Sequence, residues 1–222
     1  MTTPRREFLG WLGASGALAA AGLPLLPAAA SAEPLVPVGD KWDMSWCDRL
    51  TGKVRAVFDS PEVSEGAAMW RAQLWRDQCK EVYGTAPADT SAVIVFRHEG
   101  IPLVMNDAYW ERFEVGKEQK IRDAKGKKWS KVNPVAAPDP TAPAQYANYN
   151  LRAFLDSGGT VLACNLAFGD IVATFRKADK LSREDARARA LEYLIPGVIL
   201  QPSGIFAVLR AQQGGCNFVQ GS

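Results

Sequence analysis

The stretch Gly158-Gly159-Thr160-Val161-Leu162-Ala163-Cys164-Asn165 decides the fold class of this chain. Two turn-forming glycines precede a β-prone apolar run, and Asn165-Leu166-Ala167-Phe168 is typical of the opening of a helix. We therefore predict a strand that ends at Cys164 and passes directly into a helix. Such a junction joins two neighbouring layers of an α/β fold.

The segments on either side of this junction alternate between strand and helix, which is typical of a parallel sheet. Apolar runs predict further strands at residues 53–58, 91–96, 101–105, 198–200 and 217–219. Ser60 and Pro61 predict the start of a long helix that ends at Tyr83, before Gly84. Other helices are predicted at residues 106–113, 146–155 and 205–212, and one more directly follows Cys164. The capping pattern at residues 181–185 predicts a helix that ends at about residue 194.

Residues 1–32 are predicted to be a cleaved export signal. Arg5-Arg6 lies in a motif close to the twin-arginine pattern, an apolar stretch follows over residues 9–26, and Ala30-Ser31-Ala32 is a small-x-small cleavage site. We expect a periplasmic or otherwise exported protein that uses the twin-arginine translocation (Tat) pathway and has no membrane contact after cleavage. An uncleaved membrane anchor is the alternative.

The remaining chain is predicted to consist of an N-terminal extension, residues 33–52, and one α/β domain, residues 53–222. Its composition is that of a soluble globular protein, with 47% hydrophobic and 23% charged residues. Cleavage removes Arg5, Arg6 and Glu7, which takes one positive charge from the formal net charge of +2. A nearly neutral body in an exported protein argues against a nucleic-acid partner.

The pattern of strands and helices breaks between about residues 116 and 145. A lysine-rich stretch is followed there by four prolines, Pro134, Pro138, Pro140 and Pro143. A connection of this length in a compact domain is usually functional or mobile. Three interpretations remain: a solvated arm, a lid over the site, or a contact between subunits.

Four cysteines, Cys47, Cys79, Cys164 and Cys216, would enter an oxidising compartment, where disulfides can form. We favour free, buried thiols, and if two are bridged we expect the pair to be Cys47 and Cys216. The sequence has no haem-attachment C-x-x-C-H and no metal-type cysteine pair, so we predict no cofactor.

In open α/β sheets, ligands bind beyond the carboxyl ends of the strands. Cys164 and the only histidine, His98, both follow predicted strands, so we predict that they form a catalytic pair. A helix N-terminus and a nearby base both favour thiolate over thiol. The alternatives are an inert packed cysteine and a hydrogen-bonded histidine. Asn106, Asn165 and Ser203 also follow strands and are predicted to orient a ligand by hydrogen bonds, although Ser203 is equally suited to cap a helix.

The chain resembles the DsrE/DsrF-like superfamily. The resemblance is carried by three pieces: residues 93–103 with the Arg97-His98-Glu99-Gly100 turn, residues 151–165 with the glycine pair and Cys164, and residues 196–212 with Ser203-Gly204. It implies a flavodoxin-like three-layer fold with a mainly parallel sheet and assembly as a homo-trimer or hexamer. In the sulfur-relay members of this family a cysteine carries persulfide sulfur, and Cys164 looks like that residue.

Two functions of different classes follow. The first is a sulfur carrier or thiol-redox protein, sulfurtransferase-like, in which Cys164 takes sulfur from a small sulfane-sulfur donor and passes it to an acceptor thiol. The second is a non-catalytic module on the same fold that binds a small ligand or a protein partner. A haem or metal site formed by His98 and Cys164 is a third alternative, but two ligands alone define no metal.

Overall fold

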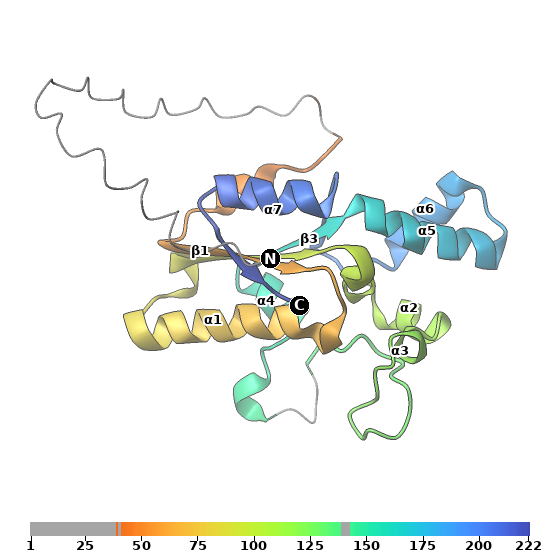
Figure 1. Cartoon of the computed structure of the whole chain (residues 1–222), viewed down its shortest axis with the longest axis horizontal. Helices are drawn as coiled ribbons and strands as arrows, with labels where there is room; N and C mark the ends of the chain where they lie inside the picture. The colour runs from red at the N-terminus through yellow and green to blue at the C-terminus, as the bar shows by residue number, and fades with distance from the viewer. Residues whose placement is uncertain (1–38, 40, 139–142) are drawn as a thin grey trace, which may run out of the picture. The chain divides into compact units, whose positions relative to one another are not determined.

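A computed structural model describes residue 39 and residues 41–138 and 143–222. The proposed export signal lies outside these residues. The chain has the predicted α/β fold, with a five-stranded, all-parallel sheet between two helical layers, as in flavodoxin-like proteins (Figure 1). The spatial order of the strands is β4-β3-β2-β1-β5. Their bounds are β1 Val54–Ser60, β2 Thr90–Phe96, β3 Thr160–Cys164, β4 Ile199–Gln201 and β5 Asn217–Gln220.

Side chains of the central strands point alternately into two hydrophobic clusters, one on each face of the sheet. In β2, Ile94 and Phe96 belong to the larger cluster, whereas Val93 and Val95 belong to the smaller one. All seven residues of this strand are buried. A continuous apolar run is therefore explained by helices on both faces, which is the usual reason for such runs in parallel sheets.

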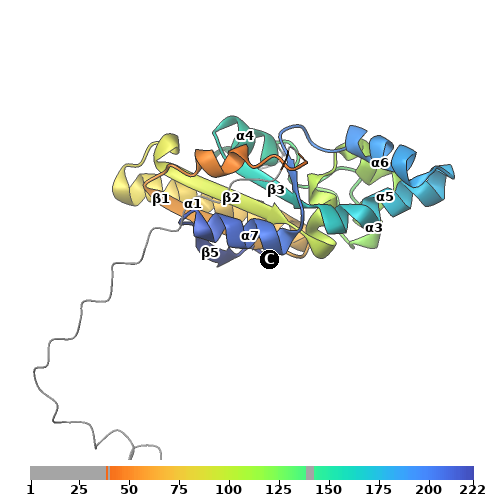
Figure 2. The same cartoon turned by 90° about the horizontal axis from the view of Figure 1, so that it is seen from above.

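The two faces are covered unequally (Figures 1 and 2). The smaller cluster is covered by α7, Gly204–Gln213, and by the 3-10 helix η2, Ser45–Arg49, which contributes the fully buried Trp46. The larger cluster lies on the other face of the sheet, and the five longer α-helices on that face contribute buried side chains to it. These are α1 Ala67–Tyr83, α2 Asp107–Arg112, α4 Leu151–Asp156, α5 Asn165–Asp179 and α6 Arg183–Glu192.

The predicted start of the first helix is wrong. Ser60 is the last residue of β1, and α1 begins only at Ala67, after the short 3-10 helix η3, Ser64–Gly66. Glu65 and Gly66 have positive φ angles of 53° and 85°, which interrupt any helix that starts at Pro61. The predicted end is confirmed, because Gly84 terminates α1 in the left-handed conformation that glycine adopts without strain.

The predicted strand at residues 101–105 is also wrong, because His98–Val104 forms the 3-10 helix η5. Its apolar residues are buried, as a strand would require, but they pack beneath α5 and beside β3 without joining the sheet. Short apolar runs carry too little periodicity to separate these two outcomes. The helix predicted at 146–155 is shorter than expected, since Asn150 caps α4 and only the 3-10 turn η6, Ala144–Tyr146, precedes it.

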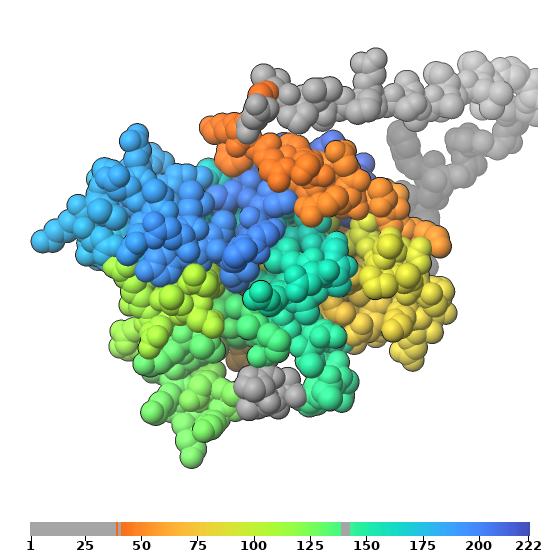
Figure 3. All heavy atoms as spheres, turned by 180° about the vertical axis from the view of Figure 1, so that it is seen from behind, coloured from red at the N-terminus to blue at the C-terminus, as the bar shows by residue number. Residues whose placement is uncertain are grey.

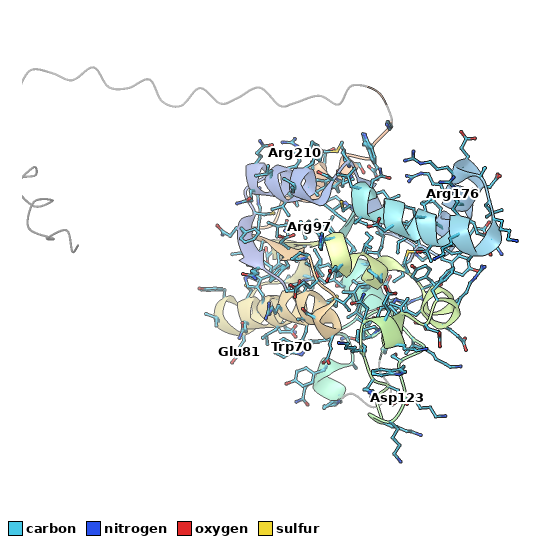
Figure 4. All side chains as sticks on the ribbon, turned by 45° about the vertical axis from the view of Figure 1, so that its right-hand side comes forward. Trp70, Glu81, Arg97, Asp123, Arg176 and Arg210 are labelled. Atoms are coloured by element: carbon cyan, nitrogen blue, oxygen red, sulfur yellow. The ribbon has the colours of Figure 1, made fainter. Side chains whose placement is uncertain are left out.

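The irregular connection predicted at 116–145 contains only short regular pieces among its described residues. It includes most of α3, Val115–Glu118, and an antiparallel bridge that joins Arg122 and Trp129. Asp123 accepts backbone N–H groups of the turn between them, and the loop projects from the rest of the domain (Figures 3 and 4). Within residues 41–138 and 143–222, no helix is long and apolar enough to span a membrane.

Candidate functional site

Cys164 lies at the predicted junction, as the last residue of β3 and the N-cap of α5. Its Sγ accepts a hydrogen bond from the backbone N–H of Ala167 at 3.4 Å. The side chain therefore faces unpaired N–H groups and the positive end of a 15-residue helix. Cys164 is only 6% exposed, so its sulfur lies just beneath the surface at the carboxyl edge of the sheet.

The strands on both sides of β3 bring further polar residues to this edge. Phe96 of β2 pairs with Ala163, which places Arg97 beside Cys164, and Gln201 of β4 pairs with Cys164 directly. Gly204 lies so close to Arg97 that a Cβ at this glycine would be 2.5 Å from Arg97 Cβ. This contact fixes the start of α7 against the stem of the arginine.

Arg97 forms a bidentate ion pair with Asp59, the penultimate residue of β1. Its Nε and one terminal nitrogen donate to the two carboxylate oxygens at 2.7 and 2.8 Å. The Asp59 side chain is 9% exposed and that of Arg97 is 30% exposed. The hydrogen bonds to Asp59 raise the pKa of Arg97, burial opposes this, and the negative charge of Asp59 raises it further. Arg97 is therefore a permanent positive charge in the electrostatic surroundings of Cys164.

His98, the predicted partner of Cys164, follows β2 at the same edge of the sheet. It is exposed, with a positive φ of 50° at the start of η5, and no hydrogen bond joins it to Cys164 among the described residues. The residue before His98, Arg97, is the basic side chain at this edge that is fixed by an ion pair, with Asp59 as its partner. The sequence placed His98 and Cys164 at the same edge of the sheet, but it did not identify Arg97 as the fixed basic residue there.

The three predicted ligand-binding side chains already make local hydrogen bonds. Asn106 caps α2 through Tyr109 N–H, and it follows η5 rather than a strand. Ser203 caps α7 through Phe206 N–H, in agreement with the structural alternative for this residue. Asn165 does lie next to Cys164 at the carboxyl edge of the sheet, and its Oδ1 accepts a hydrogen bond at 2.8 Å from Arg187.

Arg187 is a residue whose role the sequence did not reveal. Helical spacing on α6 predicts that it lies with Arg183 and Arg189 on a solvated face. It is instead half-buried, with its guanidinium carbon 5.5 Å from the centre of the Phe168 ring and one N–H bound to Asn165. Arg187 thus joins α6 to the first turn of α5 and brings a second positive charge toward the site.

All four cysteines are free thiols, and the pairing of Cys47 with Cys216 is not present. These two residues nevertheless pack in the same hydrophobic cluster. Burial raises the pKa of the thiols of Cys47 and Cys79, and it raises that of Cys216 to about 11. Burial therefore disfavours the thiolate form at these three positions.

Replacing Arg97 by glutamine should lower the free energy of unfolding by about 3 kcal/mol, because a nearly buried carboxylate at Asp59 loses its charge partner. The matched control is Lys53→Gln, which breaks an exposed ion pair with Asp89 and should cost less than about 1 kcal/mol. Urea unfolding at neutral pH measures both values. Equal costs for the two variants would contradict the importance of the Asp59–Arg97 pair.

Residues 41–138 and 143–222 contain no group of three or more His, Cys, Asp or Glu side chains that could hold a metal ion. His98 and Cys164 thus have no third such donor beside them in the described part of the chain.

Comparison with known proteins does not extend this description. The sequence matches no protein-family model and no curated protein. Among solved structures, the chain is similar to MTH1491, a protein of unknown function from Methanobacterium thermoautotrophicum, with a TM-score of 0.36 and 13% sequence identity. The match covers 75% of this chain and 98% of that one. The assignment of a function therefore depends on the residues around Cys164.

Proposed function

We propose that this chain is an exported DsrE-like protein that carries sulfane sulfur as a persulfide on Cys164. The observation that supports the proposal best is the position of Cys164 Sγ. It accepts the Ala167 N–H at the N-terminus of α5, and the charge of Arg97 lies beside it. A helix terminus and a fixed guanidinium both stabilise negative charge on sulfur.

Loading of the carrier is a transfer of neutral sulfur. The Cys164 thiolate attacks the outer sulfur of a donor persulfide, R–S–SH, and forms a new S–S bond while the S–S bond of the donor breaks. The products are Cys164–S–SH and the donor thiolate R–S⁻, so no external oxidant or reductant is needed. Attack on the outer sulfur of Cys164–S–SH by an acceptor thiolate completes the cycle and regenerates the Cys164 thiolate.

The burial of Cys164 limits which reactions it can perform. Sγ is too enclosed for a bulky partner to reach without local movement at the start of α5. A persulfide, in contrast, places its terminal sulfur about 2 Å beyond Sγ. The terminal sulfur of the persulfide is therefore more accessible to an acceptor than Sγ of the free thiol. This difference suits a sulfur carrier, because the loaded form is the one that must react with the acceptor.

The surroundings of Cys164 support a protein acceptor or another copy of this chain. Leu166 is 71% exposed at the start of α5, and Ile205 is 66% exposed at the start of α7. Both helices begin at the carboxyl edge of the sheet, because Cys164 and Gln201 are paired in neighbouring strands. Exposed apolar side chains beside a reactive group are typical of protein contacts. A homo-trimer or hexamer formed through this edge is part of the proposal.

The proposed location is the periplasm or another exported compartment, reached through the Tat pathway. Replacing Arg5 and Arg6 together by lysine should slow export, since the pathway reads the arginine pair. Cell fractionation with an antibody against the folded domain measures the fraction retained in the cytoplasm. Unchanged export of the double variant would show that another route reads the leader.

Cys164 should react with iodoacetamide faster than Cys79 and Cys216 at neutral pH, because burial raises the pKa of those two thiols. Arg97→Gln should slow the reaction of Cys164 about fivefold, which corresponds to the loss of about 1 kcal/mol of charge interaction. His98→Ala is the comparison variant, because it shows whether His98 or Arg97 has the larger effect on the alkylation rate of Cys164. Peptide mapping of alkylated protein gives the rate at each cysteine.

The alternative function is a non-catalytic module that binds a small ligand or a protein at the same edge. The low exposure of Cys164 favours it. If Cys164 is the slowest of the four thiols and is insensitive to both Arg97→Gln and His98→Ala, the carrier proposal fails. The binding module then becomes the function that the site supports.

A further inference from the structure

A second site lies at the opposite, amino-terminal edge of the sheet. An open cavity of about 460 Å³ is lined there by α1, by the segment that joins α1 to β2, and by the C-terminal end of α4. Figure 3 shows the yellow end of α1 and its connecting segment beside the teal residues around α4. Thr90, the first residue of β2, and Ser157, which precedes β3, both line the cavity. It is therefore separate from Cys164, which ends β3 at the other edge.

Arg76 is the most unusual residue of this cavity. It is only 7% exposed, yet none of the described carboxylates lies within ion-pairing distance of it. Two of its nitrogens donate to Oγ and O of Ser157 at 2.8 Å, and its guanidinium carbon is 5.5 Å from the centre of the Phe154 ring. Burial lowers the pKa of Arg76, and the charge of Asp77 opposes this. A buried cation without a charge partner is costly.

The bonds to Ser157 use only part of the hydrogen-bonding capacity of Arg76. A guanidinium has five N–H donors, and two of them are bound to Ser157. Thr85 also lines this cavity, and its Oγ1 is buried and has no hydrogen-bond partner among the described residues. Buried polar groups without partners are rare in folded proteins. Both groups are suited to donate to an oxygen-bearing ligand.

The other charges of the cavity restrict the class of ligand. Lys80 adds one positive charge to that of Arg76, and Asp77 and Asp156 add two negative charges. The lining is therefore neutral as a whole and has no positive excess for a phosphate dianion or a polyanion. A carboxylate matches one guanidinium in charge and in planar geometry. The volume lies in the usual range of about 300–1,000 Å³ for small-molecule sites.

We propose that this cavity binds a small organic carboxylate, with Arg76 as its charge partner and Thr85 as a hydrogen-bond donor. Other polar side chains of the lining, among them Gln73 and Asp77, then meet the rest of the ligand. The site is independent of sulfur transfer at Cys164 and would exist equally in a non-catalytic binding module.

The test is a titration of the full protein with propionate, a monocarboxylate, followed by backbone amide NMR shifts of residues around the cavity. Propionate should give saturable shifts at Thr85 and Ser157, whereas sodium chloride at equal ionic strength should not. Thr85→Val, which keeps the shape and removes the hydroxyl, should weaken binding about fivefold. Arg76→Gln should abolish binding. If the glutamine variant does not fold, Arg76→Lys, which retains the charge, takes its place in the titration. Lys177→Gln, on the exposed side of α5, is the charge-matched control.

Three results would overturn the proposal. The first is an absence of saturable shifts with propionate. The second is equal affinity of the original protein and Arg76→Gln, which would show that Arg76 only holds the end of α4. The third is saturable binding of inorganic phosphate in preference to propionate, which would assign the cavity to another class of anion.

Discussion

Replacing Trp110 by alanine is expected to lower the free energy of unfolding by about 3 to 5 kcal/mol, a larger loss of stability than that expected for Arg97→Gln. Trp110 is completely buried in the larger hydrophobic cluster. Its indole Nε1 donates to the carbonyl oxygen of Pro102 at 2.8 Å, which ties α2 to η5. Truncation therefore leaves a cavity and removes an anchor of the segment that carries His98.

Two further variants separate these contributions. Trp110→Phe keeps most of the buried volume and loses the hydrogen bond, so it should cost less than the alanine variant; the bond itself is worth about 1 kcal/mol. Trp70→Ala is the control for loss of an indole, since Trp70 is 43% exposed and its main aromatic neighbours are Tyr146 and Tyr149. Urea unfolding should rank the costs as Trp110→Ala above Trp70→Ala. The reverse order would contradict the placement of the core.

The sheet could be predicted from sequence because its strands carry strong local signals. β2 is an unbroken apolar run and β3 follows a glycine pair, so the predicted bounds of both strands lie within one residue of those in the structure. The start of α1 could not be predicted in the same way. Ser60 followed by Pro61 is a good helix-start signal, but pairing with Phe96 of β2 makes Ser60 the last residue of β1. A long-range contact outweighed the local preference.

The candidate site was only partly predictable for a related reason. The sequence placed Cys164 at a strand-to-helix junction and placed Arg97 and His98 after a neighbouring strand. It could not show that Arg97 is fixed by a carboxylate whereas His98 is exposed. That difference depends on the left-handed turn at His98 and on the pairing of Arg97 with Asp59, 38 residues earlier in the chain. The approach of Arg187 to Asn165 likewise depends on how α6 packs against α5.

The central proposal, that Cys164 carries sulfane sulfur, is tested most directly by intact-mass measurement of the protein after treatment with polysulfide. The protein should gain the mass of one sulfur atom, and a thiol reductant should remove it. Cys164→Ser should abolish the gain, because burial raises the pKa of the other three thiols and so disfavours the reactive thiolate there. Cys79→Ser, which replaces another buried cysteine, should leave the gain unchanged. A gain that persists in Cys164→Ser, or a protein that takes up no sulfur at all, would contradict the proposal.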